Sequence, residues 1–267
     1  MEHIADFAAV VMLVVFVSIG CALIVFLRRN WRRELLAADD ALNENNVEEV
    51  APLPPLDATP DRPQFFGYKT SWIAVRSGNA EDIVRVFVDA EVFRANWASG
   101  NEAARQGLEF VTPVVDGWVF IIAPWGTIAT GDDPFVFAEE LSRQFGESQY
   151  FHTHRIVDAH AWYLFRNGQE LRGYEYLGES GSTDRNHGER TPGEIALGYQ
   201  YFDESSPEAS SEEYWERDDL TSPSEDHVME VAGKWSIDPR TLDEREEVSC
   251  GWVIRRSTLG YEKEWDV

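Results

Sequence analysis

A cluster of histidines is the part of this sequence whose residue types are best suited to chemistry. Positions 151 to 162 read FHTHRIVDAHAW, so His152 and His154 stand one residue apart, and His160 follows a carboxylate, Asp158. Side chains of a β-strand alternate between its two faces, so on one continuous strand these four groups share a face. An H-x-H pair on a strand suits zinc or iron. The spacing predicts a metal site at His152, His154 and His160.

A structural interpretation of the same stretch competes with the metal site. The span from Gly146 to Asp158 resembles the first metal motif of the cupin family, but Asp158 stands where cupins carry glutamate. Phe165 stands where they carry glycine, and the second cupin motif with its later histidine has no counterpart. A turn at Asp158–Ala159 would also break the strand. We therefore favour histidines that pack within a sheet, with a metal-dependent hydrolase or oxygenase as the alternative.

Motifs of other catalytic classes are missing from the sequence. No G-x-G-x-x-G, Walker loop, H-E-x-x-H or G-x-S-x-G pattern occurs. The two cysteines, Cys21 and Cys250, lie in different contexts and form no disulfide framework, which is typical of a reducing compartment. The sequence thus predicts a protein that is not an enzyme and has no cofactor.

The charge of the chain limits its partners. The formal net charge is −25 and the isoelectric point is about 4.5. Phosphate backbones repel such a chain, because nucleic-acid binding depends on lysines and arginines that neutralise phosphate. Nucleic acid is therefore excluded as a partner. A basic protein or divalent cations fit the charge better, and an acidic surface that serves solubility is the simpler alternative.

The N-terminal region predicts a membrane anchor. The run from Phe7 to Leu27 contains no charged residue in 21 positions. At a rise of ~1.5 Å per residue, a helix of this length spans roughly 31 Å, the thickness of a bilayer core. The run is long for a cleaved signal peptide, and no positive charge precedes it. We expect an uncleaved transmembrane helix.

A basic flank follows the apolar run and predicts its orientation. The flank comprises Arg28, Arg29, Trp31, Arg32 and Arg33. Trp31 is an aromatic residue suited to the headgroup layer. The four arginines of the flank contrast with the acidic residues that precede the apolar run. By the positive-inside rule this places the N-terminus outside and the rest of the chain in the cytoplasm. The predicted location is the bacterial inner membrane, with the lipid bilayer and other integral membrane subunits as partners.

Five segments are predicted along the chain. Residues 1–36 form the anchor and its flank, and residues 37–63 form a proline-rich linker with seven acidic residues and one arginine. Such a composition favours an extended, semi-rigid chain. Residues 64–202 form the globular domain. Residues 203–226 form an acidic insert, and residues 227–267 form a C-terminal segment packed on the domain.

Local patterns predict the secondary structure of the globular domain. Strands are expected at Ser71–Arg76 and near Gln149–Val157, and helices at Asn79–Asp89 and Asp133–Phe145. Two hairpins are expected at the pairs Asp116–Gly117 and Asn167–Gly168, because both positions of a type I′ turn need φ > 0. The order β-α-β-β-α-β, with one or two further strands, predicts a ferredoxin-like α+β sheet with two helices on one face.

Four aromatic residues are candidates for partner docking. Trp118 and Trp125 bound the run WVFIIAPW, which is very apolar for an exposed strand and indicates either burial or a docking face. The acidic insert carries ten acidic residues and one arginine and is expected to be disordered alone. Tyr214 and Trp215 interrupt it and would anchor it to a surface.

Larger blocks of the sequence carry two resemblances. DGWVF, FGESQYFHTHRIVDAHAWYLF, GYEYLGE and WSIDPRTLD together resemble an uncharacterised bacterial soluble α+β domain over roughly residues 65 to 260. In layout, though not in motifs, the chain resembles the H subunit of photosynthetic reaction centres. Both have an outside N-terminus, one N-terminal helix, a basic inner flank and a cytoplasmic domain.

These observations favour an accessory function. The leading hypothesis is a non-catalytic, single-span accessory or assembly subunit of a larger membrane complex, of the bioenergetic type, photosynthetic or respiratory. The first alternative is a membrane-tethered, metal-dependent enzyme that uses His152, His154 and His160. The second is an immunity or sensor protein whose acidic face binds a basic partner.

Overall fold

The computed structural model describes residues 52–88, 90–124, 134–178, 182–203 and 206–256. These residues all belong to the second of two compact units, residues 51–267. Several predicted site residues lie outside the described ranges: the membrane-anchor residues Phe7, Leu27, Arg28, Arg29, Trp31, Arg32 and Arg33, and the docking candidate Trp125.

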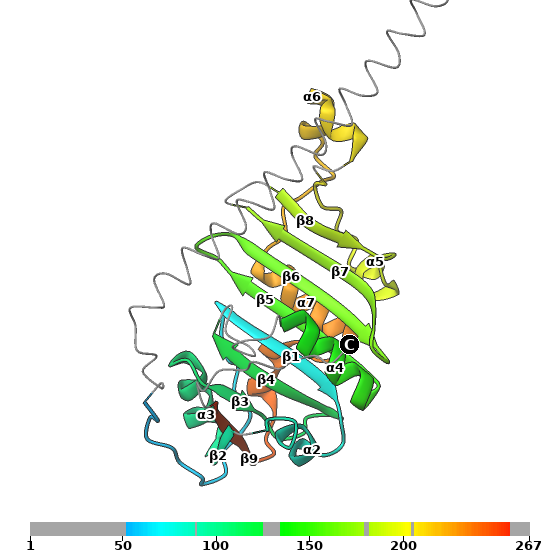
Figure 1. Cartoon of the computed structure of the whole chain (residues 1–267). Coiled ribbons are helices and arrows are strands. Elements are labelled where there is room, and N and C mark those ends of the chain that lie inside the picture. Colours follow the sequence, from blue (N-terminus) through cyan, green and yellow to red (C-terminus); the bar gives the residue numbers. More distant parts are fainter. Residues whose placement is uncertain (1–51, 89, 125–133, 179–181, 204–205, 257–267) are drawn as a thin grey trace, which may run out of the picture. The chain divides into compact units, whose positions relative to one another are not determined.

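One nine-stranded sheet forms the centre of the fold, with the strand order β2-β9-β3-β4-β1-β5-β6-β7-β8. Every neighbouring pair is antiparallel, and Figure 1 shows the strands from β2 at one edge to β8 at the other. The strands are β1 (Thr70–Arg76), β2 (Ala90–Asn96), β3 (Glu109–Val111), β4 (Trp118–Pro124), β5 (Glu147–His154), β6 (Ala159–Arg166), β7 (Gln169–Leu177), β8 (Ser182–His187) and β9 (Cys250–Arg256).

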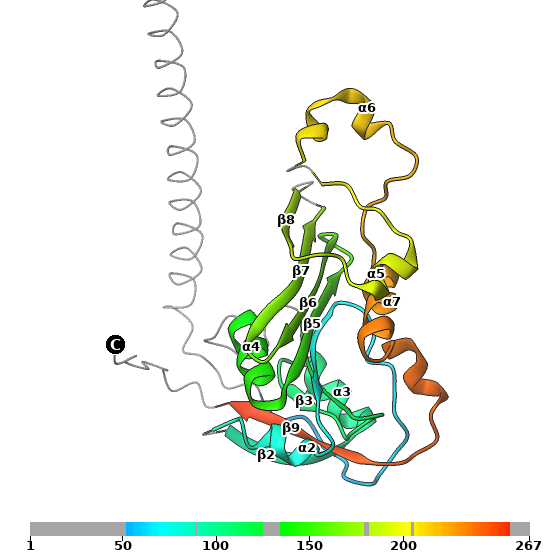
Figure 2. The same ribbon diagram turned by 90° about the vertical axis from the view of Figure 1, so that its right-hand side faces the viewer.

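Helices cover both faces of the sheet. In Figure 2, α4 lies on one side of strands β5 to β8, and α5 and α7 lie on the other. The helices are α2 (Ala80–Val84), α3 (Trp97–Arg105), α4 (Pro134–Phe145), α5 (Pro192–Leu197), α6 (Glu212–Trp215) and α7 (Glu225–Trp235), with 3-10 turns η1 (Pro207–Ser210) and η2 (Pro239–Glu244). Helices α2 and α4 pack on the face of Ile73, and α3 and α7 pack on the face of Trp72.

This double cover explains the apolar strands. A strand with one solvated face alternates apolar and polar residues, whereas a strand buried on both faces is apolar throughout. In β4, both Phe120 and its neighbour Ile121 are fully buried, one in each core. The run WVFIIA is therefore interior sheet, and the docking interpretation of this strand is not needed to explain its composition.

Both hairpins predicted from the sequence are confirmed. Asp116 and Gly117 have φ values of 49° and 81°, and they connect β3 with β4. Asn167 and Gly168 have φ values of 49° and 75°, and they connect β6 with β7. These turns depend on two adjacent residues only, which is why sequence alone predicted them.

The predicted fold class is wrong in its topology. A ferredoxin-like sheet keeps its helices on one face, whereas here helices cover both faces of a nine-stranded sheet; the predicted antiparallel pairing itself is present. The strand β9 inserts between β2 and β3, although it follows β3 by more than a hundred residues. Local sequence patterns also did not predict β2, α3 or β8. Patterns within a segment do not reveal which distant segment pairs with it.

The membrane prediction is also corrected. Within the described ranges, no helix combines the length and apolar character needed to cross a bilayer. Helix α4, with 12 residues, is only about 18 Å long, well short of the ~30 Å of a bilayer core. A transmembrane helix is therefore not part of the fold described here, and the run Phe7–Leu27 lies outside it.

Residues from the predicted linker contact the sheet domain. The carboxylate of Asp61 accepts hydrogen bonds from the backbone N–H groups of Trp97 (2.6 Å) and Ala98 (3.0 Å), at the start of α3. This is a favourable place for a carboxylate, because the first N–H groups of a helix lack partners within it. The backbone of Asp57 exchanges two hydrogen bonds with the Ser99 hydroxyl. This part of the linker thus caps a helix of the domain.

Candidate functional site

The structure separates the three histidines of the predicted metal site. Strand β5 ends at His154, and a hairpin returns the chain so that Thr153 pairs with His160 and His152 pairs with Ala161. Residues paired across antiparallel strands share a face, and neighbours along a strand do not. His160 therefore lies on the opposite face of the sheet from His152 and His154. Among the described residues, no group of three histidine, cysteine or carboxylate side chains is arranged to hold a metal ion.

His152 is a core residue. Its ring lies 6.0 Å from the ring of Tyr150 in an edge-on arrangement. Burial lowers the pKa of His152 to about 3, and repulsion from His160 and His154 acts in the same direction. The imidazole is therefore neutral at physiological pH and packs as part of the interior.

His160 forms a short polar chain on the other face. Its Nδ1 lies 2.9 Å from the Thr153 hydroxyl, and its Nε2 lies 2.9 Å from a carboxylate oxygen of Asp158. Burial lowers the pKa of His160, although the nearby Asp158 acts in the opposite direction. The order hydroxyl–imidazole–carboxylate is that of a catalytic triad, but Thr153 is fully buried and cannot reach a substrate. The arrangement satisfies a buried histidine.

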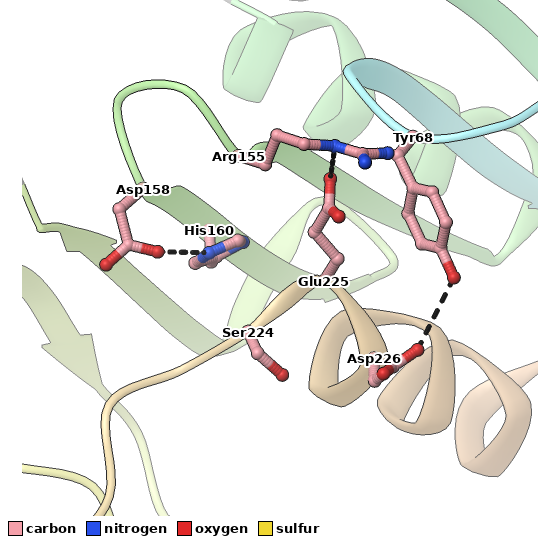
Figure 3. A pocket seen from close by; sticks show the side chains of 7 residues that line it. All are labelled: Tyr68, Arg155, Asp158, His160, Ser224, Glu225 and Asp226. Atoms are coloured by element: carbon pink, nitrogen blue, oxygen red, sulfur yellow. Dashed lines mark hydrogen bonds and ion pairs between the residues drawn. The ribbon is translucent and has the colours of Figure 1, made fainter.

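A shallow pocket of about 310 Å³ lies beside His160, where the β5–β6 hairpin meets the start of α7 (Figure 3). Its lining residues are Tyr68, Arg155, Asp158, His160, Ser224, Glu225 and Asp226. Charges in the pocket already have partners within the chain. Arg155 lies 3.3 Å from Glu225 and 5.0 Å above the ring of Tyr68. Asp226 lies 2.9 Å from Arg240. The pocket is thus a compensated surface cluster.

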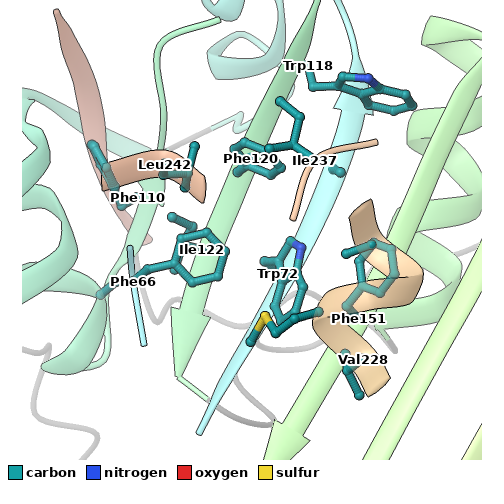
Figure 4. Packing of buried hydrophobic residues seen from close by; sticks show 14 of the residues in the cluster. Phe66, Trp72, Phe110, Trp118, Phe120, Ile122, Phe151, Val228, Ile237 and Leu242 are labelled. Carbon is teal, nitrogen blue, oxygen red and sulfur yellow. The ribbon is translucent and has the colours of Figure 1, made fainter. Parts of the chain in front are cut away.

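Trp118 lines a second pocket but is itself mostly buried. Figure 4 shows it at the margin of the core cluster, and 6% of its surface is exposed. The guanidinium group of Arg76 lies 5.6 Å from its ring. Beside it, Asp116 and Arg245 form an ion pair of 2.7 Å that closes the edge of this pocket. The structure therefore places Trp118 mainly in the core.

The acidic insert contains an ordered lobe, which we define as residues 206–219. In both views the lobe projects beyond β8 (Figure 1 and Figure 2). Tyr214 is 6% exposed and faces the base of the lobe, whereas Trp215 is 47% exposed. Of the two predicted docking residues, Tyr214 is therefore a scaffold residue and Trp215 is the one that faces solvent.

Serine caps explain why the lobe forms short helices despite its acidic composition. Ser206 and Ser211 act as N-caps, each accepting a hydrogen bond from a backbone N–H group of the short helix that follows. Pro207 occupies the first turn of η1, where its missing N–H costs nothing. These serine caps were visible in the sequence and predict turns rather than a disordered chain.

The charge of the described surface is uneven because most arginines are already paired. Arg240 and Arg256 each lie 2.9 Å from a carboxylate oxygen, and Arg245 lies 2.7 Å from one. Others rest on aromatic rings, as Arg94 does at 4.4 Å from the Trp252 ring. The excess negative charge is thus left on carboxylates such as those of the lobe, which holds six acidic residues and one arginine.

Comparison with known proteins identifies no relative for this chain. No family model matches it, and neither a curated protein nor a solved structure matches it.

Proposed function

We propose that this chain is an accessory binding protein whose acidic surface docks a basic protein partner. The observation that carries the proposal is the excess of carboxylates over cations, together with the internal pairing of most described arginines. A surface with uncompensated charge of one sign attracts a partner of the opposite sign and repels nucleic acid.

The histidines give less support to the enzymatic alternative. His160 lies on a different sheet face from His152 and His154, and both of its ring nitrogens have partners. The narrower expectation of a membrane complex depended on the run Phe7–Leu27, which is outside the described residues. Our proposal therefore keeps the accessory function and makes no use of an anchor.

Binding of defined peptides by the full chain tests the proposal. The probes are an arginine-rich peptide and an acidic peptide of equal length, each with a fluorescent label. We expect the basic peptide to bind at least about tenfold more tightly, a difference of about 1.4 kcal/mol. Affinity should fall as salt rises from about 0.01 M to about 0.1 M, because the Debye length shrinks from roughly 30 Å to roughly 10 Å.

Stoichiometry separates docking from diffuse attraction. Analytical ultracentrifugation of the complex should show a defined ratio of peptide to protein at saturation. Equal affinity for the two peptides, or an open-ended series of aggregates, would overturn the proposal.

A further inference from the structure

The lobe at residues 206–219 has a fixed internal structure. The Tyr214 hydroxyl accepts a hydrogen bond from the backbone N–H of Asp203 (2.6 Å) and donates one to the Asp203 carbonyl (3.3 Å). The ring of Tyr214 also packs edge-on against Phe202 at 5.9 Å. These contacts tie α6 to the chain that leaves the sheet. A surface that is already ordered loses less entropy when a partner binds.

Trp215 is presented to solvent in one orientation. Its ring stacks on Phe202, with centroids 5.5 Å apart and planes 12° from parallel. Its indole N–H donates to the Ala209 carbonyl at 2.8 Å. One face of the indole is thus supported while nearly half of the side chain stays exposed. Tryptophans held in this way are frequent anchors in protein interfaces, and their faces attract cations.

Carboxylates without an ion pair to a described residue flank Trp215 in the sequence. Glu212, Glu213, Glu216 and Asp218 are exposed, and none forms an ion pair with another described residue. The single arginine of the lobe, Arg217, does not compensate them. Its guanidinium donates to Asp219 (Nε–Oδ1 2.8 Å) and lies 3.5 Å from Glu208.

The lobe also shows how it accommodates a guanidinium group. Arg217 lies 6.0 Å from the ring of Tyr214 while Asp219 holds its charge, so an aromatic face and a carboxylate bind one cation together. Trp215 offers a second, exposed aromatic ring, and Glu213 and Glu216 are carboxylates close to it in sequence. No described arginine or lysine pairs with these two carboxylates. The contact made by Arg217 therefore indicates the chemistry that would suit the exposed side.

From these observations we propose that the lobe is the docking surface for an arginine- or lysine-bearing segment of a basic protein, with Trp215 as its apolar anchor. This inference rests on the proposed function and assigns the binding of the basic partner to the lobe. A cationic side chain of the partner lies against the open face of Trp215, and the neighbouring carboxylates pair with further basic residues. In both views the lobe projects beyond β8 and lies apart from α7.

Matched variants of the full chain test the site with the labelled arginine-rich peptide. Trp215→Ala should weaken binding at least about tenfold, as expected for an interface anchor. Its control is Ile195→Ala, which removes an apolar side chain that is 62% exposed on α5, outside the lobe. This control should change the affinity less than about twofold. Circular dichroism confirms that each variant is folded.

Charge reversal provides a second, independent test. Glu213→Lys with Glu216→Lys changes the net charge by the same amount as Glu244→Lys with Glu247→Lys, two exposed residues at the end of η2 and shortly after it. The lobe pair should weaken peptide binding at least about tenfold more than the control pair.

The outcomes separate the two proposals. Equal losses in the lobe and control variants would show diffuse attraction, and would overturn the docking site while leaving the proposed function in place. Failure of the unmodified chain to prefer the basic peptide would overturn the proposed function itself. If calcium ions displaced the bound arginine-rich peptide and other cations did not, the lobe would be a metal-binding site. That result would also overturn the docking site.

Discussion

Arg172 and Glu194 form an ion pair inside the protein, with 3% and 4% of their side chains exposed. The Arg172 Nε donates to both carboxylate oxygens of Glu194, at 2.9 Å and 3.2 Å. Glu194 also accepts from the indole N–H of Trp162 (2.9 Å) and from the backbone N–H of Thr191 (2.8 Å). These hydrogen bonds attach α5 to Trp162 of β6 and to Arg172 of β7. Helix α5 begins the segment that leads to the lobe.

We expect that removal of one partner from this pair strongly destabilises the fold. Glu194→Gln leaves the guanidinium buried without a counter-charge, which typically costs about 3–5 kcal/mol. Arg172→Met leaves an uncompensated carboxylate and should cost a similar amount. Urea unfolding measures both. The double variant should lose less than the sum of the two losses, and strict additivity would show that the residues are not coupled.

Asn101 provides a prediction of the opposite sign. This residue of α3 is 2% exposed, and neither its amide nitrogen nor its amide oxygen has a hydrogen-bond partner among the residues that the structure describes. A buried amide without a partner costs about 1–3 kcal/mol. Asn101→Leu keeps the branching at Cγ and the number of side-chain heavy atoms while removing both polar atoms, and it should raise the midpoint of thermal unfolding. A lower midpoint would indicate a bound internal water that the leucine displaces.

His152 should make stability depend on pH. Its folded-state pKa of about 3 lies below the ordinary value of 6.5, so the unfolded chain binds the proton more tightly. The stabilisation is therefore complete above about pH 6.5 and is lost as the pH falls toward 3, with about 2 kcal/mol lost by about pH 5. Urea titrations across this range measure the slope.

Two variants show whether His152 causes that slope. His152→Gln should flatten it without abolishing it, because burial also lowers the pKa of His160 and of His227. The second variant, Ile195→Ala, removes an exposed side chain that does not titrate, and it should leave the slope unchanged. An unchanged slope in His152→Gln would contradict this assignment.

Metal removal should not affect the fold. Because His160 faces away from His152 and His154, the three cannot share one ion. We expect that a chelator leaves the thermal midpoint of the full chain unchanged, and that elemental analysis finds zinc and iron well below one equivalent. Stoichiometric metal that is lost in His160→Gln would contradict the arrangement of this hairpin.

The sequence by itself determined the local features of this protein. The Asp116–Gly117 and Asn167–Gly168 turns follow from two residues each, and the apolar runs of β4 and β6 indicate buried strands whatever their neighbours are. The net charge of −25 predicts weak attraction to nucleic acid without reference to any fold. The serine caps of the lobe belong with these features, because each acts within a few residues of the helix it starts.

Only the tertiary structure decided what depends on pairing between distant segments. A single turn between Thr153 and His160 moves one histidine to the other face of the sheet, because side chains alternate with a period of two. The insertion of β9 between β2 and β3 depends on contacts across most of the chain. The exposed position of Trp215 depends on Phe202 and Asp203. Local patterns are compatible with several strand pairings. Packing between distant segments selects one of them, and that pairing decides which side chains are in contact.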